Sequence, residues 1–268
     1  MVYGEYLRDR HSFGRILEGE FGITGGGLSR RLVVTPLPLE EVLVGFEELL
    51  TREGIEYKWI RPRDPILGLG KGSLRILLDG SFYYVLFIGR GAVEAVDRAW
   101  IIGHDPGVEE VLFIGAAASL KRGLQAGSCN IPIYTLNIGD PSLVYAGLPN
   151  GLPIADRGLA HRVSRIAEDL GCGVASVLHA SIPYFYIETR RFLEYLSSVG
   201  VHTIDMELAY VLRMFDAMGK RAAGLLVVED SPLHGIEYMS RGYEEVRDAI
   251  DETKRILSSV ILEFLHSK

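Results

Sequence analysis

The amino-acid sequence predicts one α/β domain, residues 1–268, with a mixed, twisted central sheet that is largely parallel and has helices on both faces. Predicted strands and helices alternate along most of the chain, which is the pattern of such sheets. The 268 residues are enough to bury a sizeable core. No internal repeat, low-complexity tract or linker divides them.

Composition and charge indicate an ordinary water-soluble protein. The chain is 48% hydrophobic and 24% charged, with a net charge of −7 and a pI near 5.6, which argues against general nucleic-acid or anionic-membrane binding. The polar start and the lack of a long apolar run favour a cytoplasmic protein. Only Cys129 and Cys172 occur, which suits a reducing compartment and gives no metal-ligand pattern. Scarce Asn and Gln favour a hot-growing source.

The first 30 residues are interpreted as an atypical N-terminal extension. Its glycine-rich stretch 21–28 lacks the Lys-Ser/Thr of a P-loop, so a flexible entry loop is preferred to a phosphate cradle. A strand at 31–36 and an amphipathic helix at 39–53 are expected to follow.

The middle of the chain opens with a hairpin. Strands at 74–78 and 83–88 flank Asp79-Gly80, a strong turn signal. A helix is predicted at 92–103 after Gly89-Arg90-Gly91, and a buried strand at 111–114. Residues 115–119, Gly-Ala-Ala-Ala-Ser, are expected to leave that strand as a loop.

The remaining elements continue the alternation. Strands are predicted at 128–134, 173–178 and 222–228, helices at 159–170, 189–198 and 243–266, and a loop at 137–151. In sheets of this kind ligands bind at the C-terminal ends of the strands, so those ends are the places to look for a site.

Glu207 is the most informative single residue. Asp205 has the chemistry of a helix N-cap, and apolar residues follow it at helical spacing: Leu208, Val211, Leu212 and Phe215. Glu207 falls on the edge of that apolar face, where a carboxylate is partly buried but favoured by the helix dipole. The pattern predicts a rigid, ionised carboxylate suited to gripping two hydroxyls. The alternative is an ordinary surface acid in a first helical turn.

Residues 203–207, Thr-Ile-Asp-Met-Glu, resemble the Val-Asp-Met-Glu signature of the nucleoside phosphorylase family, which includes purine nucleoside and uridine phosphorylases and methylthioadenosine nucleosidases. The resemblance spans roughly residues 83–235. It implies the family's α/β fold, with Glu207 holding the ribose 2′- and 3′-hydroxyls and Met206 beneath the sugar. It also implies a homo-oligomer, either a dimer or a trimer of dimers.

A second carboxylate stands at the end of the predicted strand 222–228. Residues 227–231, Val-Val-Glu-Asp-Ser, resemble the family's Val-Ser-Asp element, which implies that Asp230 is the general acid protonating a purine at N7. Glu229 replaces the family's Ser or Thr, and its charge is expected to raise the pKa of Asp230. The alternative is an acidic turn before Pro232.

An aromatic segment precedes the helix predicted at 189–198. Tyr186, Phe185 and Glu188 match an aromatic-Glu-Thr element, which implies that the two rings stack on the base. Aromatic residues in a cluster are otherwise commonly core filler. The loop 139–145 also resembles the family's Gly-Thr-Ser…Tyr stretch, though faintly.

The chain departs from the family where phosphate would bind. Phe113 occupies the position of the usual arginine, Ala116 replaces the hydroxyl after Gly115, and residues 34–39 lack the early arginine. Arg90 is the candidate phosphate-binding cation from the same chain, and the alternative is that Arg90 is an ordinary solvated loop residue. Arg61 and Arg63 are candidates that a neighbouring chain would contribute across an interface. Gly115 and Ala116 resemble the small-residue loop of the hydrolytic nucleosidases.

The expected function is phosphorolysis of a purine nucleoside, or of uridine, to free base and ribose 1-phosphate. Hydrolysis by the same fold and a catalytically inactive nucleoside-binding protein are the alternatives. Inorganic phosphate would be a co-substrate, and no metal or organic cofactor is implied.

Overall fold

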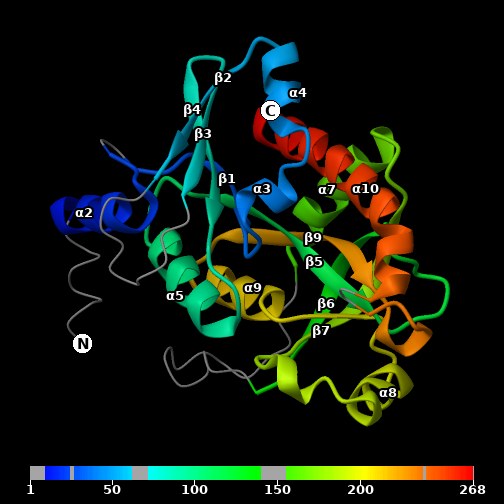
Figure 1. Cartoon of the computed structure of the whole chain (residues 1–268). Coiled ribbons are helices and arrows are strands. Elements are labelled where there is room, and N and C mark those ends of the chain that lie inside the picture. Colours follow the sequence, from blue (N-terminus) through cyan, green and yellow to red (C-terminus); the bar gives the residue numbers. More distant parts are fainter. Residues whose placement is uncertain (1–9, 25–26, 62–71, 140–154, 238–239, 268) are drawn as a thin grey trace.

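One nine-stranded mixed sheet forms the centre of the protein in a computed structural model that describes residues 10–24, 27–61, 72–139, 155–237 and 240–267 (Figure 1). Its strands are β1 Arg31–Thr35, β2 Glu56–Ile60, β3 Ser73–Leu78, β4 Ser81–Phe87, β5 Glu110–Ser119, β6 Cys129–Asn137, β7 Val174–Ser181, β8 Thr203–Asp205 and β9 Arg221–Asp230. Its helices are α2 Arg10–Phe21, α3 Leu39–Val42, α4 Phe46–Arg52, α5 Ala92–Gly103, α7 Arg157–Asp169, α8 Arg190–Ser198, α9 Leu208–Ala217 and α10 Arg241–His266, with 3₁₀ turns η1 Phe185–Ile187 and η2 Pro232–His234.

The sheet is partly closed. Its strand order is β2-β3-β4-β1-β5-β8-β7-β6-β9, and β9 pairs again with β5, so the last five strands form a ring and the first four form an arm. Strands β6, β7 and β8 are parallel to one another but antiparallel to β5 and β9. The α/β class and the mixed sheet predicted from the sequence are confirmed. Five of the nine strand pairings are parallel, but three of the five ring strands, β6 to β8, run opposite to β5 and β9.

Strand β5 changes its neighbour part-way along, and this position is important for the site. Its first half pairs with β1, ending at Phe113, and its last two residues, Ala118 and Ser119, pair with β8. Residues 114–117 pair only with β9 on the other side. The edge of β5 therefore opens between the end of β1 and the end of β8, and a point where neighbouring strands diverge is a common place for a ligand.

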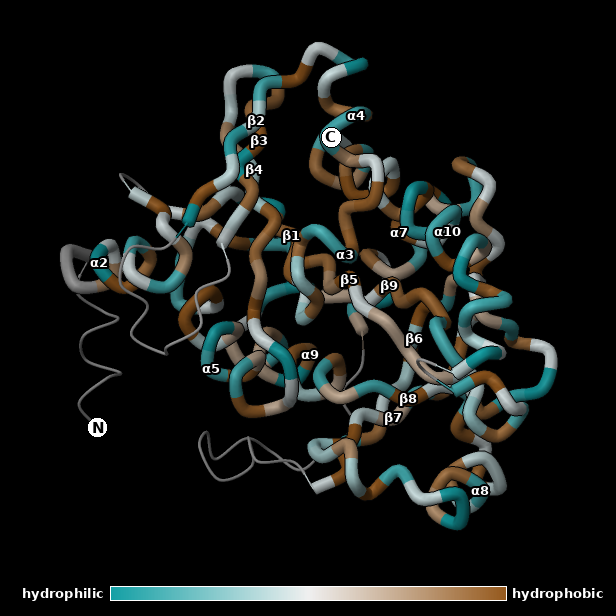
Figure 2. Tube along the Cα trace, in the orientation of Figure 1, coloured by the Kyte–Doolittle hydropathy of each residue, from teal (hydrophilic) through white to brown (hydrophobic). Residues whose placement is uncertain are grey.

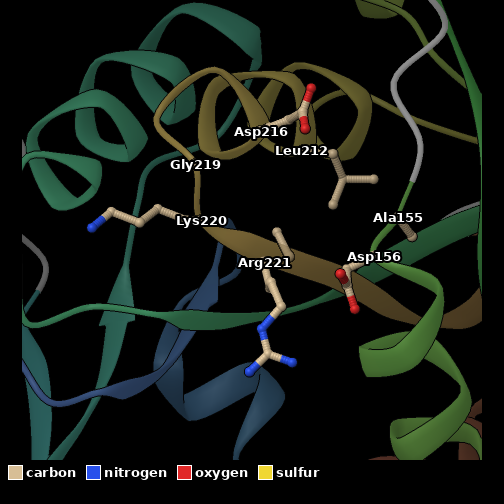
Figure 3. A pocket seen from close by; sticks show the side chains of 8 residues that line it. Ala155, Asp156, Leu212, Asp216, Gly219, Lys220 and Arg221 are labelled. Carbon is tan, nitrogen blue, oxygen red and sulfur yellow. The ribbon is translucent and has the colours of Figure 1, made fainter.

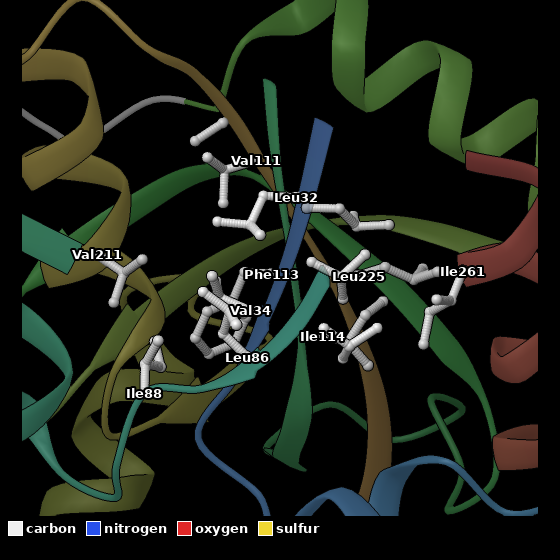
Figure 4. Close-up of a cluster of buried hydrophobic side chains, with 14 of the residues drawn as sticks. Leu32, Val34, Leu86, Ile88, Val111, Phe113, Ile114, Val211, Leu225 and Ile261 are labelled. Carbon is white, nitrogen blue, oxygen red and sulfur yellow. The ribbon is translucent and has the colours of Figure 1, made fainter. Parts of the chain in front are cut away.

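Apolar strands separate two layers of helices (Figure 2). Helices α5 and α9 pack together on one face, and α10 with α7 and α4 covers the other. Figure 4 shows Val211 of α9 and Ile261 of α10 approaching the buried strand residues from opposite sides. Both residues are 1% exposed or less, as are Leu32 and Ile114 between them. The two helical layers hold the central strands in place, and with them the strand ends that border the site.

Several predicted elements are confirmed almost to the residue. Helix α5 has the predicted bounds, and the hairpin β3–β4 turns at Asp79 and Gly80, whose φ values of 49° and 77° fit a tight two-residue turn. The predicted helix at 39–53 is instead two short helices, because Gly45 adopts a φ of 71° between α3 and α4. Strands β2 and β8 and helix α2 were not predicted.

Helix α2 belongs to the main core. Leu17 and Phe21 are each 1% exposed, and Glu20 forms a buried ion pair with Arg98 of α5 at 3.5 Å. The segment after it also packs inside, since Ile23 is 3% exposed. The part of the extension that the structure describes is therefore a structural element, although residues 25–26 of the predicted entry loop lie outside the described residues.

Cys129 and Cys172 are joined in a disulfide that connects β6 to the turn before β7. The two cysteines are therefore not free thiols, and the compartment stays a prediction. Disulfides persist in oxidising compartments and also inside some hyperthermophilic cells, so this bond assigns neither location.

Candidate active site

The corner between β8 and α9 positions Glu207. Asp205, the last residue of β8, accepts hydrogen bonds from the backbone N–H groups of Glu207 at 3.2 Å and Leu208 at 2.9 Å. These bonds satisfy N–H groups at the start of α9. The N-cap position itself is Glu207, so the prediction of Asp205 as the N-cap is wrong by two residues, although Asp205 does accept from the helix start. Because β8 runs antiparallel to β5, the chain after Asp205 continues beside the open edge of β5.

A glycine turn approaches Glu207 from the other side of that opening. The backbone N–H of Gly91, between β4 and α5, donates a 2.6 Å hydrogen bond to Oε1 of Glu207 across 116 residues of sequence. Gly89 and Gly91 adopt φ values of 90° and 85°, which glycine tolerates at little cost. The turn therefore brings a donor to Glu207 that no sequence pattern near Glu207 reveals.

Glu207 is 8% exposed, and its carboxyl group is a strongly perturbed acid. Its pKa is raised to about 8, mainly by burial and then by the negative charge of Asp205, while the Gly91 N–H and Arg90 act in the opposite direction. The predicted partial burial is thus exceeded, and the predicted ionised carboxylate is wrong. At neutral pH this group holds its proton, so one oxygen accepts from Gly91 and the group also carries a donor hydrogen.

Arg90 lies within electrostatic reach of Glu207 but is largely exposed. Its guanidinium contacts Glu41 of α3 at 2.9 Å, with side-chain exposures of 56% and 49%. Such an exposed pair contributes only about 0–1 kcal/mol, so an anionic ligand can compete with Glu41 for the guanidinium. The role of Arg90 as a phosphate ligand stays a prediction.

Gly115 and Ala116 lie inside a strand, since β5 continues to Ser119. The prediction of a loop at residues 115–119 is therefore wrong. A Cβ on Gly115 would lie 2.6 Å from the ring of Phe113, which is itself 1% exposed, so Gly115 makes room for that ring. Both small residues border the open edge between β1 and β8, and their contact with a substrate stays a prediction.

Asp230 ends β9 on the opposite flank of β5. Ala118 is paired with Ile204 of β8 on one side and with Asp230 on the other. Two strand spacings therefore separate Asp230 from Ile204, roughly 10 Å. Because Glu207 follows Ile204 by three residues, both predicted catalytic carboxyl groups border the same stretch of β5.

Glu229 has an ion-pair partner that the sequence did not indicate. Its carboxylate pairs with Lys254 of α10 at 2.6 Å, and both side chains are largely buried. The register of β9 against β5 shifts at Glu229, which lies between the residues paired with Ala117 and Ala118, and the Glu229 charge is matched by the cation of α10. The expectation that Glu229 raises the pKa of Asp230 stays a prediction.

The predicted base-binding residues are exposed on the turn η1. Phe185 and Tyr186 are 74% and 75% exposed, and Tyr184 stacks on Tyr186 with ring centroids 5.4 Å apart. They are therefore not core filler. Burial raises the pKa of Glu188 to about 7, and Met206 is half-buried beside Glu207. The roles of these four residues toward a nucleoside stay predictions, and most of the loop 139–145, with Arg63, lies outside the described residues.

A polar network beneath Glu207 was not foreseen. His179 and Ser181 of β7 both contact the carboxylate of Asp205, and all three side chains are buried. The sequence offered one signal for this network, namely a His and a Ser two residues apart in a strand otherwise made of apolar and small residues.

A cavity of about 330 Å³ lies away from these residues, at the start of β9 and the end of α9 (Figure 3). Its charged side chains, Asp156, Asp216, Lys220 and Arg221, point in different directions (Figure 3). Nine residues separate Arg221 from Asp230 along β9, roughly 30 Å. Without converging polar groups, this cavity lacks the character of a catalytic site.

Metal and membrane features can be assessed for the described part of the chain. Within it, no group of three or more His, Cys, Asp or Glu side chains is arranged to hold a metal ion. No helix there is both long and apolar enough to cross a bilayer.

The sequence model of the Phosphorylase superfamily matches residues 33–266, most of the chain. The chain belongs to this superfamily. The resemblance to nucleoside phosphorylases that the motifs predicted is thus confirmed. The match begins within β1, so α2 and the rest of the N-terminal extension lie outside it. No curated protein matches the sequence.

Solved structures share the fold at low identity. Purine nucleoside phosphorylase from Toxoplasma gondii, in complex with immucillin-H, is 20% identical, with a TM-score of 0.66 over 91% of this chain and 95% of its own. A futalosine hydrolase mutant of Helicobacter pylori is 15% identical, with a TM-score of 0.68 over 90% and 100%. The Campylobacter jejuni 5′-methylthioadenosine/S-adenosyl homocysteine nucleosidase is also 15% identical, with a TM-score of 0.69 over 90% and 100%. Phosphorylase and hydrolase structures are thus equally good matches to the fold.

Proposed function

We propose that the chain cleaves the N-glycosidic bond of a purine nucleoside, with uridine as a poorer substrate. The observation that carries this proposal is the placement of Glu207 and Asp230 on the two flanks of β5, with the gap between β1 and β8 beside Glu207. Glu207, held by the Gly91 N–H, grips the ribose hydroxyls, while Asp230 protonates the leaving base.

The protonation of Glu207 suits this role. A neutral carboxyl group can donate to one ribose hydroxyl and accept from the other, whereas a carboxylate only accepts. Bond cleavage builds positive character on the sugar, so release of that proton to solvent would leave a carboxylate beside it, and its negative charge would favour the transition state. Met206, next in the chain, packs beneath the sugar in this arrangement.

We infer that phosphate is the acceptor and that Arg90 binds it. Arg90 is the cation next to Glu207, its pairing with Glu41 is exposed and weak, and the turn that carries it leads into the N-terminus of α5. Water is the second candidate acceptor. The buried Phe113 and the small Ala116, which stand where the family has a guanidinium and a hydroxyl, favour it.

A stacking role for Phe185 and Tyr186 requires a cover over their exposed rings. We propose that a second copy of the chain supplies it, in a dimer or a trimer of dimers, because two rings left three-quarters in water hold a base poorly. Light scattering of the purified protein tests this, and a monomer that still cleaves nucleosides would contradict it.

Release of free base from inosine, adenosine, methylthioadenosine and uridine, each with and without phosphate, tests the reaction. Release only with phosphate supports phosphorolysis, and Arg90→Ala is then expected to raise the phosphate KM. Equal release in both conditions assigns hydrolysis. Glu207→Ala and Asp230→Asn are each expected to lower kcat/KM at least about 100-fold. Binding of nucleosides without release would overturn the enzymatic proposal and indicate a binding protein.

A further inference from the structure

A buried network of four side chains lies under the Glu207 corner. Asp205 Oδ1 accepts from His179 Nε2 at 3.0 Å and from Ser181 Oγ at 2.5 Å. The other ring nitrogen of His179 lies 2.9 Å from Oγ1 of Thr203. His179, Ser181 and Thr203 are each 0% exposed, and Asp205 is 8% exposed, so water competes little for these bonds.

One assignment of donors and acceptors satisfies every contact of the network. An ionised Asp205 only accepts, so His179 donates from Nε2, and its Nδ1 then accepts the hydroxyl proton of Thr203. Ser181 donates to Asp205 and accepts from the backbone N–H of Ala209 at 2.8 Å. Every group in the network is therefore satisfied by a neutral histidine and an anionic aspartate.

The network acts on Glu207 through the backbone. With His179 and Ser181 on one side, the Asp205 carboxylate is oriented so that its two oxygens meet the N–H groups of Glu207 and Leu208. The register of β7 against β8 places His179 opposite Thr203 and Ser181 opposite Asp205, so both donors come from rigid strand positions. A 1 Å shift of a substrate-gripping group costs up to about 100-fold in rate, which gives such a support its value.

We propose that His179 and Ser181 are positioning residues for Glu207, acting through Asp205 to fix the direction of the group that holds the ribose. This inference rests on the proposed function for its kinetic consequence only, because the fixed backbone is a property of the protein without substrate. The negative charge of Asp205 is also one cause of the raised pKa of Glu207, so the same network influences both the direction of that group and its proton.

The first test uses no substrate. Amide hydrogen exchange at Glu207 and Leu208 is compared in the wild type, His179→Leu and His179→Gln. The leucine removes the donor to Asp205, whereas the amide of glutamine can replace it. Exchange at both amides is expected to rise at least about tenfold in His179→Leu relative to amides elsewhere in the sheet, and to stay near wild type in His179→Gln. Equal exchange in all three proteins would overturn the proposal.

The second test uses activity on a ribonucleoside and on its 2′-deoxy analogue. His179→Leu is expected to lower kcat/KM for the ribonucleoside about 10- to 100-fold, to lower it less for the deoxy analogue, and to be largely rescued by His179→Gln. Equal losses on both substrates, or no rescue, would indicate a merely structural residue. If the wild type cleaves no nucleoside, the proposed function fails, and the exchange measurement still decides the positioning role.

A second variant covers the case in which His179→Leu does not fold. Ser181→Ala removes the other donor to Asp205, and its matched control is Ser258→Ala, which removes a buried hydroxyl that donates to Val44 on the far helical layer at 3.0 Å. Faster exchange at Glu207 and Leu208 is expected in Ser181→Ala alone. The same change in both serine variants would refute the proposal.

Discussion

The buried proton of Glu207 makes the stability of the protein depend on pH in a way that one substitution removes. Glu207→Gln keeps the size of the side chain and the oxygen that accepts from Gly91 at 2.6 Å, but it cannot ionise. Burial, aided by Asp205, raises the pKa of Glu207 from an ordinary 4.5 to about 8. The native protein therefore binds this proton more tightly than the unfolded chain does, and the stabilisation is fully present below pH 4.5.

The magnitude follows from linkage. Between about pH 4.5 and 8 the unfolded chain has released the proton while the native protein retains it, so wild-type stability falls by about 1.4 kcal/mol per pH unit relative to the glutamine variant. From pH 5.5 to 7.5 the difference between the two proteins is expected to change by about 2.7 kcal/mol in favour of Glu207→Gln. Above pH 8 the difference levels off.

Urea unfolding of both proteins at the two pH values measures this change. Other titrating groups, including Glu188, contribute equally to both proteins and cancel in the comparison. A gap between wild type and variant that is the same at both pH values, within about 0.5 kcal/mol, would refute the claim that Glu207 is protonated at neutral pH.

Three further substitutions probe the fold by chemical unfolding. Gly115→Ala is expected to cost about 1–3 kcal/mol because its Cβ meets the ring of Phe113 at 2.6 Å, whereas the control Gly173→Ala, with open space around it, is expected to be near neutral. Arg98→Met removes a guanidinium that is 1% exposed and contacts Glu20 and Glu94, and it is expected to lower the free energy of unfolding by about 3–5 kcal/mol. An unchanged free energy of unfolding would mean that these buried ion pairs contribute nothing. Cys172→Ala removes a disulfide that spans 43 residues, and it is expected to lower the free energy of unfolding by about 4 kcal/mol under oxidising conditions. In the presence of a reductant, the variant and the wild type are expected to have the same stability.

Local signals in the sequence were sufficient for much of the fold. Helix α5 and the β3–β4 hairpin were predicted closely because their periodicity and their turn residues are local. The three-residue strand β8 was missed, since only its partners in β5 and β7 make it a strand. The reversal of β6 to β8 within the ring is likewise a property of long-range pairing and leaves no trace in a single strand.

The candidate site was likewise predicted from the sequence only in part. The position of Glu207 followed from its motif, but its partner Gly91 lies 116 residues away, and its protonation depends on burial that the helical pattern underestimated. Glu229 was assigned to Asp230 by adjacency in the sequence, whereas its actual partner is Lys254 on a distant helix. Adjacency in the sequence does not reveal that partner, because Lys254 reaches Glu229 only through the packing of α10 on β9.

The closed ring has a consequence for biosynthesis. Strand β5 is made early, yet its partner β9 follows it by about a hundred residues, and β8 follows by nearly as many. Until residues 221–230 leave the ribosome, β5 has an unpaired edge on the β9 side, and exposed edges of this kind invite pairing with other chains. Assembly of the ring must therefore wait for the last strand of the sheet, which predicts slow, late folding and a nascent chain that benefits from chaperones.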